Sequence, residues 1–223
     1  MPAAIASPAA VRRPPDAAQV RSPRPPGSTW RENDQIIVTS SVSWASYVAV
    51  RALCDTPGIR MAYNQGVLEI MSPSVTHEGV KTLIGRLLET FAIERNIELQ
   101  GYGSTTLRKE IKERGLEPDE CYCVGREMTQ MGHEMTQAPD FAIEVVISGG
   151  GIDKLPIYAS LGVREVWFWC EGRFQLFRLV GEAYEPTATT ELMPGLDLDQ
   201  VARHVEMGNQ HQAVRAFLAL LRK

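Results

Sequence analysis

One acidic residue stands where the sequence predicts a fully buried strand. Residues Phe141 to Ile147 are apolar and mostly β-branched except for Glu144, and such a run is typical of a strand buried on both faces. A carboxylate in that position is costly unless a cation or a hydrogen-bond donor pairs with it. A second acid, Asp119, follows Pro118 and opens another expected strand, Glu120 to Val124. We therefore take Asp119 and Glu144 as the first candidates for a chemical site.

The connection between these two strands decides which acids can meet. Residues 125–139 form a polar, methionine-rich loop, so the strands are expected to pair as an antiparallel hairpin. Asp119 then lies near Glu144 or Val145, where two carboxylates can share one metal ion. Asp140 also opens its strand, but it lies four residues from Glu144, roughly 13 Å away along a strand. We therefore expect Asp119 and Glu144 to form the pair, with Asp140 as the weaker candidate.

A histidine lies at the start of the most regular helix in the sequence. Apolar residues recur with helical spacing from Val80 to Phe91, and Ser74 or Thr76 is the expected N-cap. His77 lies on the backward extension of that apolar stripe, at the end where the helix dipole is positive. Two interpretations of His77 are open: it faces a site at the helix start, or it makes only a local hydrogen bond there.

Two neighbouring carboxylates suit the hydrolysis of a phosphodiester bond. That reaction needs charge neutralised at the scissile phosphate and a water activated near neutral pH, and Mg²⁺ held by carboxylate oxygens supplies both. A buried ion-pair network contains the same residue types. The pattern therefore leaves metal ligands and structural carboxylates as two open interpretations of Asp119 and Glu144.

The predicted elements indicate an α/β (α+β) fold. Its core comprises a helix over residues 80–91, an interrupted strand over 97–102 and 105–109, the two acid-bearing strands, a short helix after the glycines at 149–151, and a strand over 163–170. The flanking elements are a strand over 36–39, a helix over 44–53, a hairpin over 59–71, a hairpin over 173–184, an extended segment over 191–199 and a helix over 211–221. We expect a mixed central sheet flanked by helices, in the order αβββαβ, with extra N- and C-terminal hairpins and a C-terminal helix.

Length and composition are those of one globular domain. The chain has 223 residues and is 44% hydrophobic, enough for one sizeable core. It has no run of 18 apolar residues that could span a membrane, and its N-terminus lacks the apolar segment of a secretory signal. Cys121 and Cys123 alternate on a strand instead of forming a zinc-binding C-x2-C pair. We therefore expect a cytoplasmic protein that has no membrane partner and whose cysteines are small core residues.

The N-terminal stretch has a different composition from the rest. Residues 1–29 hold seven of the 14 prolines, and such a segment cannot bury enough surface to offset its ordering entropy. Residues 1–31 carry five arginines and one aspartate, a net charge of +4; the whole chain carries −4, which leaves −8 on the remainder. We predict a disordered tail over 1–29, either solvated or binding nucleic acid, and a single domain over 30–223. The acidic domain argues against broad contact with DNA, but not against a confined cleft.

The order of elements, with acids on the second and third core strands, resembles the PD-(D/E)XK nuclease superfamily. More closely, the chain resembles the Uma-two family of restriction-endonuclease-like proteins, over roughly residues 36–200. The resemblance is carried by four motifs: SPSVTH at 72–77, EPDECYCV at 117–124, PDFAIEV at 139–145 and KLPIYASLGVREVW at 154–167. It implies a restriction-endonuclease-like core, a single nuclease-like domain over 30–223, and a Mg²⁺- or Mn²⁺-dependent endonuclease acting on DNA.

The resemblance also assigns roles to residues of this chain. Asp119 corresponds to the first metal-binding acid and Glu144 to the second, and the backbone carbonyl of Val145 to a third ligand. Asp140 falls on a further motif position. His77 lies within the first motif and stays a candidate catalytic residue.

Three departures from the family pattern concern the lysine and the turn before it. The superfamily lysine is expected two residues after the glutamate, where this chain has Val146. The resemblance therefore assigns its task to Lys154, on the helix that follows the strand. Gly150 replaces an acid, and glycines 149–151 replace a Ser-Pro-Ser turn. These changes leave open a catalytically inactive copy that acts as a DNA-binding or interaction module. The implied partner is DNA, and a homodimer is an open alternative to a monomer.

Overall fold

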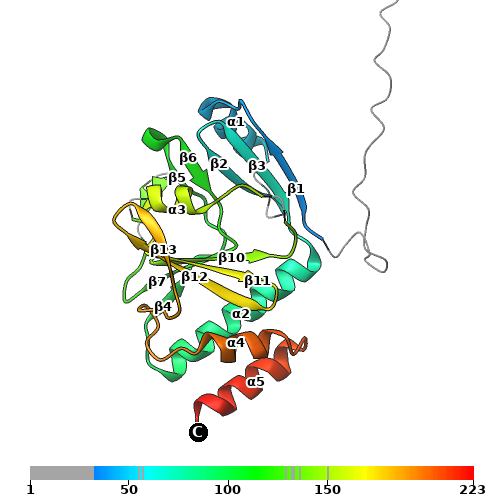
Figure 1. Ribbon diagram of the computed structural model, residues 1–223, viewed down its shortest axis with the longest axis vertical. Helices are drawn as coiled ribbons and strands as arrows, with labels where there is room; N and C mark the ends of the chain where they lie inside the picture. Colours follow the sequence, from blue (N-terminus) through cyan, green and yellow to red (C-terminus); the bar gives the residue numbers. More distant parts are fainter. Residues whose placement is uncertain are drawn as a thin grey trace, which may run out of the picture.

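The computed structural model of the protein describes residues 33–54, 56, 58–128, 130–131, 134–135, 137–149 and 151–223 (Figure 1). The tail predicted over residues 1–29, the domain start at Trp30 and the departure at Gly150 lie outside the described residues. Within the described part, no helix combines the length and the apolar character needed to cross a membrane.

A six-stranded mixed sheet forms the centre of the protein. Its strands are β4 (Leu99–Gly101), β7 (Glu120–Val124), β10 (Phe141–Val146), β11 (Glu165–Cys170), β12 (Arg173–Val180) and β13 (Ala183–Thr187). They lie in the order β13-β12-β11-β10-β7-β4, with β10 and β11 parallel and all other neighbours antiparallel. With helices α2 (Val75–Glu94) and α3 (Leu155–Leu161), the chain order is α2-β4-β7-β10-α3-β11. This confirms the mixed sheet and the αβββαβ core.

Helix α2 covers one face of the central sheet because its apolar stripe is continuous. Ser74 caps the helix by accepting a hydrogen bond from the backbone N–H of His77 at 3.1 Å. The predicted stripe is confirmed: one core cluster contains Leu83, Ile84, Leu87, Leu88 and Phe91 of α2 together with Phe141, Ile143 and Trp167 of the sheet. The C-terminal helices α4 (Leu198–Val205) and α5 (Gln210–Leu221) pack against α2 on its outer side (Figure 1).

Helix α5 was expected from the sequence, but α4 was not. The prediction of an extended segment up to Asp199 is wrong, because α4 already begins at Leu198. Asp197 caps it by accepting a hydrogen bond from the backbone N–H of Gln200 at 3.0 Å. The helix has only eight residues, and it buries only Val201, Ala202 and Val205. That is too short a stripe to separate a helix from an irregular segment by periodicity.

A second, five-stranded antiparallel sheet lies above the central sheet in Figure 1. Its strands are β1 (Gln35–Thr39), β2 (Arg60–Asn64), β3 (Val67–Ser72), β5 (Leu107–Lys109) and β6 (Arg114–Leu116), in the order β1-β3-β2-β6-β5. The predicted hairpin is confirmed as β2 and β3, joined by Gln65 and Gly66 at positive φ. Helix α1 (Trp44–Leu53), capped by Ser43, packs its Tyr47 against this sheet.

One expected strand is divided between the two sheets. Its first part becomes β4 in the central sheet, and its second part becomes β5 in the other sheet. After β5 the chain forms a short 3-10 helix, η1 (Glu110–Lys112), and then β6. The predicted loop over 125–139 contains two two-residue strands, β8 (Gln130–Met131) and β9 (Glu134–Met135). Strands of two or three residues are too short for the alternation that reveals a strand in the sequence.

Helix α3 lies between the two sheets (Figure 1). Pro156 stands in its first turn, and Gly162 ends it at a φ of 83°. Ile157 and Tyr158 are buried in a cluster that includes Ala62, Leu107 and Leu116 of the second sheet and Cys121, Ala142 and Val166 of the central sheet. Lys154, at the start of α3, therefore lies where the two sheets meet.

Candidate active site

Asp119 and Glu144 are brought together by the pairing of β7 and β10. In this antiparallel register Ile143 pairs with Glu120, so Asp119, one residue before β7, falls opposite Glu144. The backbone N–H of Val145 donates a 2.8 Å hydrogen bond to Asp119 Oδ2. Both side chains are buried, with exposures of 1% for Asp119 and 2% for Glu144. The structure therefore places the two carboxylates side by side in the core, at the end of β10 away from Asp140.

Glu144 is held at both carboxylate oxygens by residues of α3. Lys154 Nζ lies 2.7 Å from Glu144 Oε2, and the Tyr158 hydroxyl donates to Glu144 Oε1. Burial raises the pKa of Glu144; the Lys154 charge lowers it, and the neighbouring Asp119 raises it again, so that it stands at about 7. Burial alone would lower the pKa of Lys154, but Glu144, Asp119 and Glu69 together raise it above its ordinary value. Lys154 is therefore a cation fixed beside the acidic pair.

His77 is fully buried between two carboxylates. Its Nδ1 atom lies 3.1 Å from Asp34 Oδ2, and its Nε2 atom lies 3.0 Å from Asp119 Oδ1. The contact to Asp119 has the distance of an ion pair but not the alignment of a hydrogen bond. Burial lowers the pKa of His77, but Asp119 and Asp34 outweigh it and raise the pKa to about 9. Of the two interpretations of His77, the structure favours the one in which it faces the acids at the helix start.

Asp34 completes this row of charges and was not predicted. Its Oδ1 accepts a 2.9 Å hydrogen bond from the backbone N–H of Ser74, and its own backbone N–H donates to Ser148 Oγ at 3.2 Å. Asp34 thus joins the start of α2 to the segment that follows β10. It stands just before β1 in a short polar stretch, 43 residues from His77. No local pattern in the sequence distinguishes it from a loop aspartate.

Asp140 lies at the opposite end of β10 and serves a different purpose. Its Oδ2 accepts a 3.0 Å hydrogen bond from the backbone N–H of Val124 and pairs with Arg126 Nε at 3.0 Å. Its Oδ1 lies 3.4 Å from Arg164 Nη1. The carboxylate therefore fastens the loop after β7 to the start of β10 and β11. It is not brought to the Asp119–Glu144 pair, as its distance along the strand predicted.

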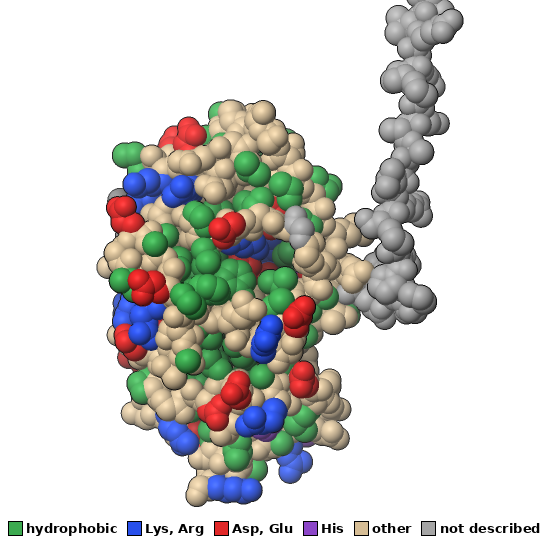
Figure 2. Space-filling view, viewed as in Figure 1, with side chains coloured by type: hydrophobic (Ala, Val, Ile, Leu, Met, Phe, Trp, Pro, Cys, Tyr) green, Lys and Arg blue, Asp and Glu red, His purple; other side chains and the backbone are tan. Residues whose placement is uncertain are grey.

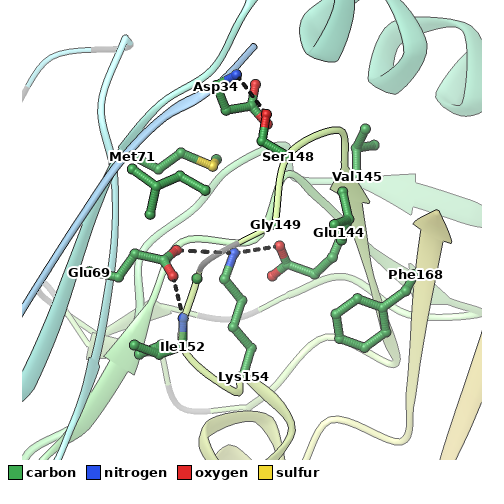
Figure 3. A pocket seen from close by; sticks show the side chains of 13 residues that line it. Asp34, Glu69, Met71, Glu144, Val145, Ser148, Gly149, Ile152, Lys154 and Phe168 are labelled. Carbon is green, nitrogen blue, oxygen red and sulfur yellow. Dashed lines mark hydrogen bonds and ion pairs between the residues drawn. The ribbon is translucent and has the colours of Figure 1, made fainter. Parts of the chain in front are cut away.

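A third buried acid, Glu69 of β3, reaches the site from the second sheet. Its Oε1 lies 3.6 Å from Lys154 Nζ, and its Oε2 accepts a 2.7 Å hydrogen bond from the backbone N–H of Ile152. Figure 3 shows the Lys154 ammonium between Glu69 and Glu144. Its sequence signal is an acid within the apolar run VLEIM, the same misfit that singles out Glu144.

A cavity of about 240 Å³ lies beside these residues at the junction of the two sheets; Asp34 is on its lining, but His77 and Asp119 are not. Its lining includes Glu69, Glu144 and Lys154, with Ile36, Met71 and Phe168 as apolar walls. Figure 2 shows acidic and basic side chains at the bottom of a hollow, and charges of both signs interspersed over the rest of that face. A ligand would therefore meet the site in a confined hollow, without a uniformly basic surface around it.

Oxygen donors for a divalent cation are present at this place. Among the described residues, no group of three or more His, Cys, Asp or Glu side chains is arranged to hold a metal ion. Asp119 Oδ1 is nevertheless buried and makes no hydrogen bond within the described part of the protein. Mg²⁺ prefers a few carboxylate oxygens and keeps several waters. Asp119 and Glu144 are therefore the carboxylates that could hold such an ion here, and the Val145 carbonyl stays a predicted ligand.

Comparison with known proteins gives the family. The family model described as Uma2: Putative restriction endonuclease matches residues 45–208, which are 164 of the 223 residues. The matched span contains Glu69, His77, Asp119, Glu144 and Lys154, but it begins after Asp34. No curated protein matches the chain. Because the match covers more than half of its length, the chain belongs to the Uma2 family of restriction-endonuclease-like proteins.

Proposed function

We propose that the protein is a metal-dependent endonuclease that hydrolyses phosphodiester bonds in DNA. The observation that carries this proposal is the buried pair of Asp119 and Glu144, with the Lys154 ammonium beside it at a cavity. Two acids and a lysine are the groups that this chemistry requires, and the family match supports a nuclease. DNA as the substrate follows from the family and is part of the proposal.

The metal and the protein have separate tasks in this proposal. Asp119, Glu144 and the Val145 carbonyl would hold Mg²⁺ or Mn²⁺, which supplies charge neutralisation at the phosphate and a more acidic bound water. Lys154 places a fixed positive charge where negative charge develops on the phosphoryl oxygens. Tyr158 orients Glu144, and His77 with Asp34 behind it holds Asp119, as residues around a metal site commonly orient its ligands.

The lysine has moved from the strand to the helix in this proposal. Val146 occupies the position two residues after Glu144 and offers no donor. Lys154 lies ten residues after Glu144 and reaches its Oε2 at 2.7 Å. The lysine that the family pattern places on β10 is thus replaced by Lys154 at the start of α3, which contacts the Glu144 carboxylate.

One experiment tests the proposal directly. Purified protein is incubated with linear and supercoiled DNA, with Mg²⁺, with Mn²⁺ and with a chelator, and Mn²⁺ binding is measured by calorimetry in the wild type and in Asp119→Ala. Cleavage that requires the metal, with loss of both cleavage and Mn²⁺ binding in Asp119→Ala, supports the proposal. Metal binding that survives in Asp119→Ala contradicts the assigned ligands.

A second candidate function is a catalytically inactive nuclease fold that binds DNA or another partner. The observation that favours it is the closed network at Glu144, whose two oxygens are already engaged by Lys154 and Tyr158. In that case the wild type binds DNA without cleaving it under any metal, and Asp119→Ala retains the binding. The cleavage assay therefore separates the two functions, and a gel-shift assay with the same DNA measures the binding.

A further inference from the structure

Glu69 is out of place in the strand that carries it. Strand β3 is otherwise apolar from Val67 to Met71, and the neighbours of Glu69 on the adjacent strands are Val38 and Ala62. Its side chain is only 3% exposed. A carboxylate buried among apolar neighbours needs compensation from outside its own sheet. That compensation comes from the segment between β10 and α3.

The two contacts of Glu69 both fall on that segment. One oxygen accepts the backbone N–H of Ile152 at 2.7 Å, and the other lies 3.6 Å from Lys154 Nζ. Lys154 also contacts Glu144 at 2.7 Å, so its ammonium bridges a carboxylate of each sheet (Figure 3). A lysine stem has several rotatable bonds, and one salt bridge leaves it considerable freedom. Contacts from two sides restrict it to one position.

Gly151 shows how closely Glu69 approaches this segment. A Cβ atom added to Gly151 would lie 2.5 Å from Glu69 Oε2, which is closer than non-bonded atoms allow. Gly149, two residues earlier, has no atom within 4 Å of such a Cβ. Of these two positions, only 151 is therefore too close to Glu69 for a larger side chain.

We propose that Glu69 is a positioning residue, which fixes the Gly151–Ile152 segment and holds Lys154 in place opposite Glu144. The second sheet thereby completes the site instead of merely packing beside it. The effect on cleavage rests on the proposed nuclease function, whereas the effect on the position of Lys154 does not.

The first test measures Lys154 without any nuclease activity. The protein is treated briefly with acetic anhydride at one pH, and acetylation of each lysine is followed by mass spectrometry, with exposed Lys112 as the internal reference. In the wild type Lys154 should react slowly, because it is largely buried and paired with two carboxylates. In Glu69→Ala its relative rate should rise about fivefold, the loss expected for one ion-pair contact.

Matched glycine variants separate position from general damage. Gly151→Ala should raise the acetylation of Lys154 as Glu69→Ala does, because the added methyl group displaces the Glu69 carboxylate. Gly149→Ala should leave the acetylation of Lys154 unchanged. In the double variant Glu69→Ala with Gly151→Ala, the second change should add nothing, since the clash no longer exists. Equal effects of Gly149→Ala and Gly151→Ala would overturn the proposal.

A second buried glutamate controls for instability. Glu117 is as buried as Glu69 and accepts a backbone hydrogen bond from Met61, but it lies away from the cavity. Glu117→Gln should lower the melting temperature without exposing Lys154 to acetylation. If it exposes Lys154 as much as Glu69→Ala does, the effect comes from loss of stability and not from position.

Activity gives the final readout. Glu69→Gln keeps an oxygen that can accept from Ile152 N and loses only the charge facing Lys154, whereas Glu69→Ala loses both. For a positioning role we expect kcat to fall about tenfold in Glu69→Ala and less in Glu69→Gln, with KM for DNA within about threefold of the wild type. A rise in KM alone would overturn the positioning role. If the wild type does not cleave DNA, the nuclease proposal fails and the acetylation results still decide the role of Glu69.

Discussion

The two ends of β10 carry one carboxylate each, and the two are treated in opposite ways. Asp140 at the start is satisfied at both oxygens, by a backbone N–H and by two arginines. At the other end, Glu144 faces a cavity and a buried lysine, beside an Asp119 oxygen that makes no hydrogen bond with any described group. Burial alone therefore does not separate a structural acid from a functional one. The two ends differ instead in their surroundings: Glu144 lies at a cavity beside a second buried acid, Asp119, whereas Asp140 pairs with two arginines.

The largest expected effect follows from this difference. Glu144→Gln keeps the size of the side chain and removes the charge that would hold a metal ion, so cleavage of DNA should fall by about 10³-fold or more. Initial rates on a linear duplex at saturating Mn²⁺ measure it. Asp140→Asn is the matched control, and its rate should stay within about threefold of the wild type. Equal losses in both variants would remove the distinction between the two ends of β10.

Lys154 is tested next, at the end of β10 that carries Glu144. Lys154→Met keeps the stem and removes the ammonium, so we expect kcat to fall about 10²-fold, while Mn²⁺ binding remains. Single-turnover cleavage and calorimetry measure the two quantities separately. Lys112→Met, at an exposed position, is the control. A Lys154→Met variant that cleaves as fast as the wild type would show that the helix lysine does not replace the missing strand lysine.

A smaller effect is expected for Asp34, which acts through His77. Asp34→Asn should lower kcat roughly tenfold, because His77 then holds Asp119 less firmly. It also tests a pH dependence of folding. Burial raises the pKa of Asp34, but the hydrogen bonds from His77 and Ser74 outweigh it and lower the pKa below its ordinary value of 3.8.

The sign of this pH dependence follows from the lowered pKa. The contribution of Asp34 to stability is present above pH 3.8 and is lost as the pH falls through the lower, folded-state value. Urea unfolding of the wild type and Asp34→Asn should therefore differ most above that pH, and the two curves should converge in acid. A difference that grows toward low pH would contradict the assigned role of Asp34.

The smallest effect on catalysis and a clear effect on stability are expected at Asp140. Asp140→Asn weakens its contacts with Arg126 and Arg164 while leaving an acceptor for Val124, which should cost about 1–3 kcal/mol of unfolding free energy. Equilibrium urea unfolding measures it. Arg126→Gln should cost a similar amount, and the double variant should cost less than the sum of the two, because both changes remove the same contact. Additive costs would argue against that contact.

The core of the fold could be predicted because its elements are long and strongly patterned. The apolar stripe of α2 and the continuous apolar runs of β10 and β11 leave little choice of secondary structure, and the connection from β7 to β10 sets their pairing. The division of residues 97–109 between two sheets could not be predicted. Strands β4, β5 and β6 have three residues each, and their pairing depends on tertiary contacts and not on local pattern.

In the candidate site, too, residues with a local signal could be predicted and residues placed by tertiary contacts could not. Glu144 is visible in the sequence because an acid is out of place in an apolar strand, and Asp119 because it opens the neighbouring strand after Pro118. Their adjacency follows from one hairpin register. Asp34 lies in a polar segment, where an aspartate is unremarkable, and only the packing of β1 against β3 brings it to His77. Glu69 carried the same signal as Glu144, but its partner Ile152 lies 83 residues away, in the segment between β10 and α3, which no local pattern reveals.

The long sequence separations within the site bear on how the chain acquires it during synthesis. Asp34 and Ser148 are 114 residues apart, and Glu69 and Ile152 are 83 residues apart. Contacts between residues so far apart in the sequence form late, because the entropy of closing a long loop is lost before the contact stabilises the fold. A nascent chain that has not yet emerged past Lys154 contains Asp34 and Glu69 but lacks the partner that Glu69 contacts at the start of α3. The candidate site is therefore completed only after most of the chain has left the ribosome.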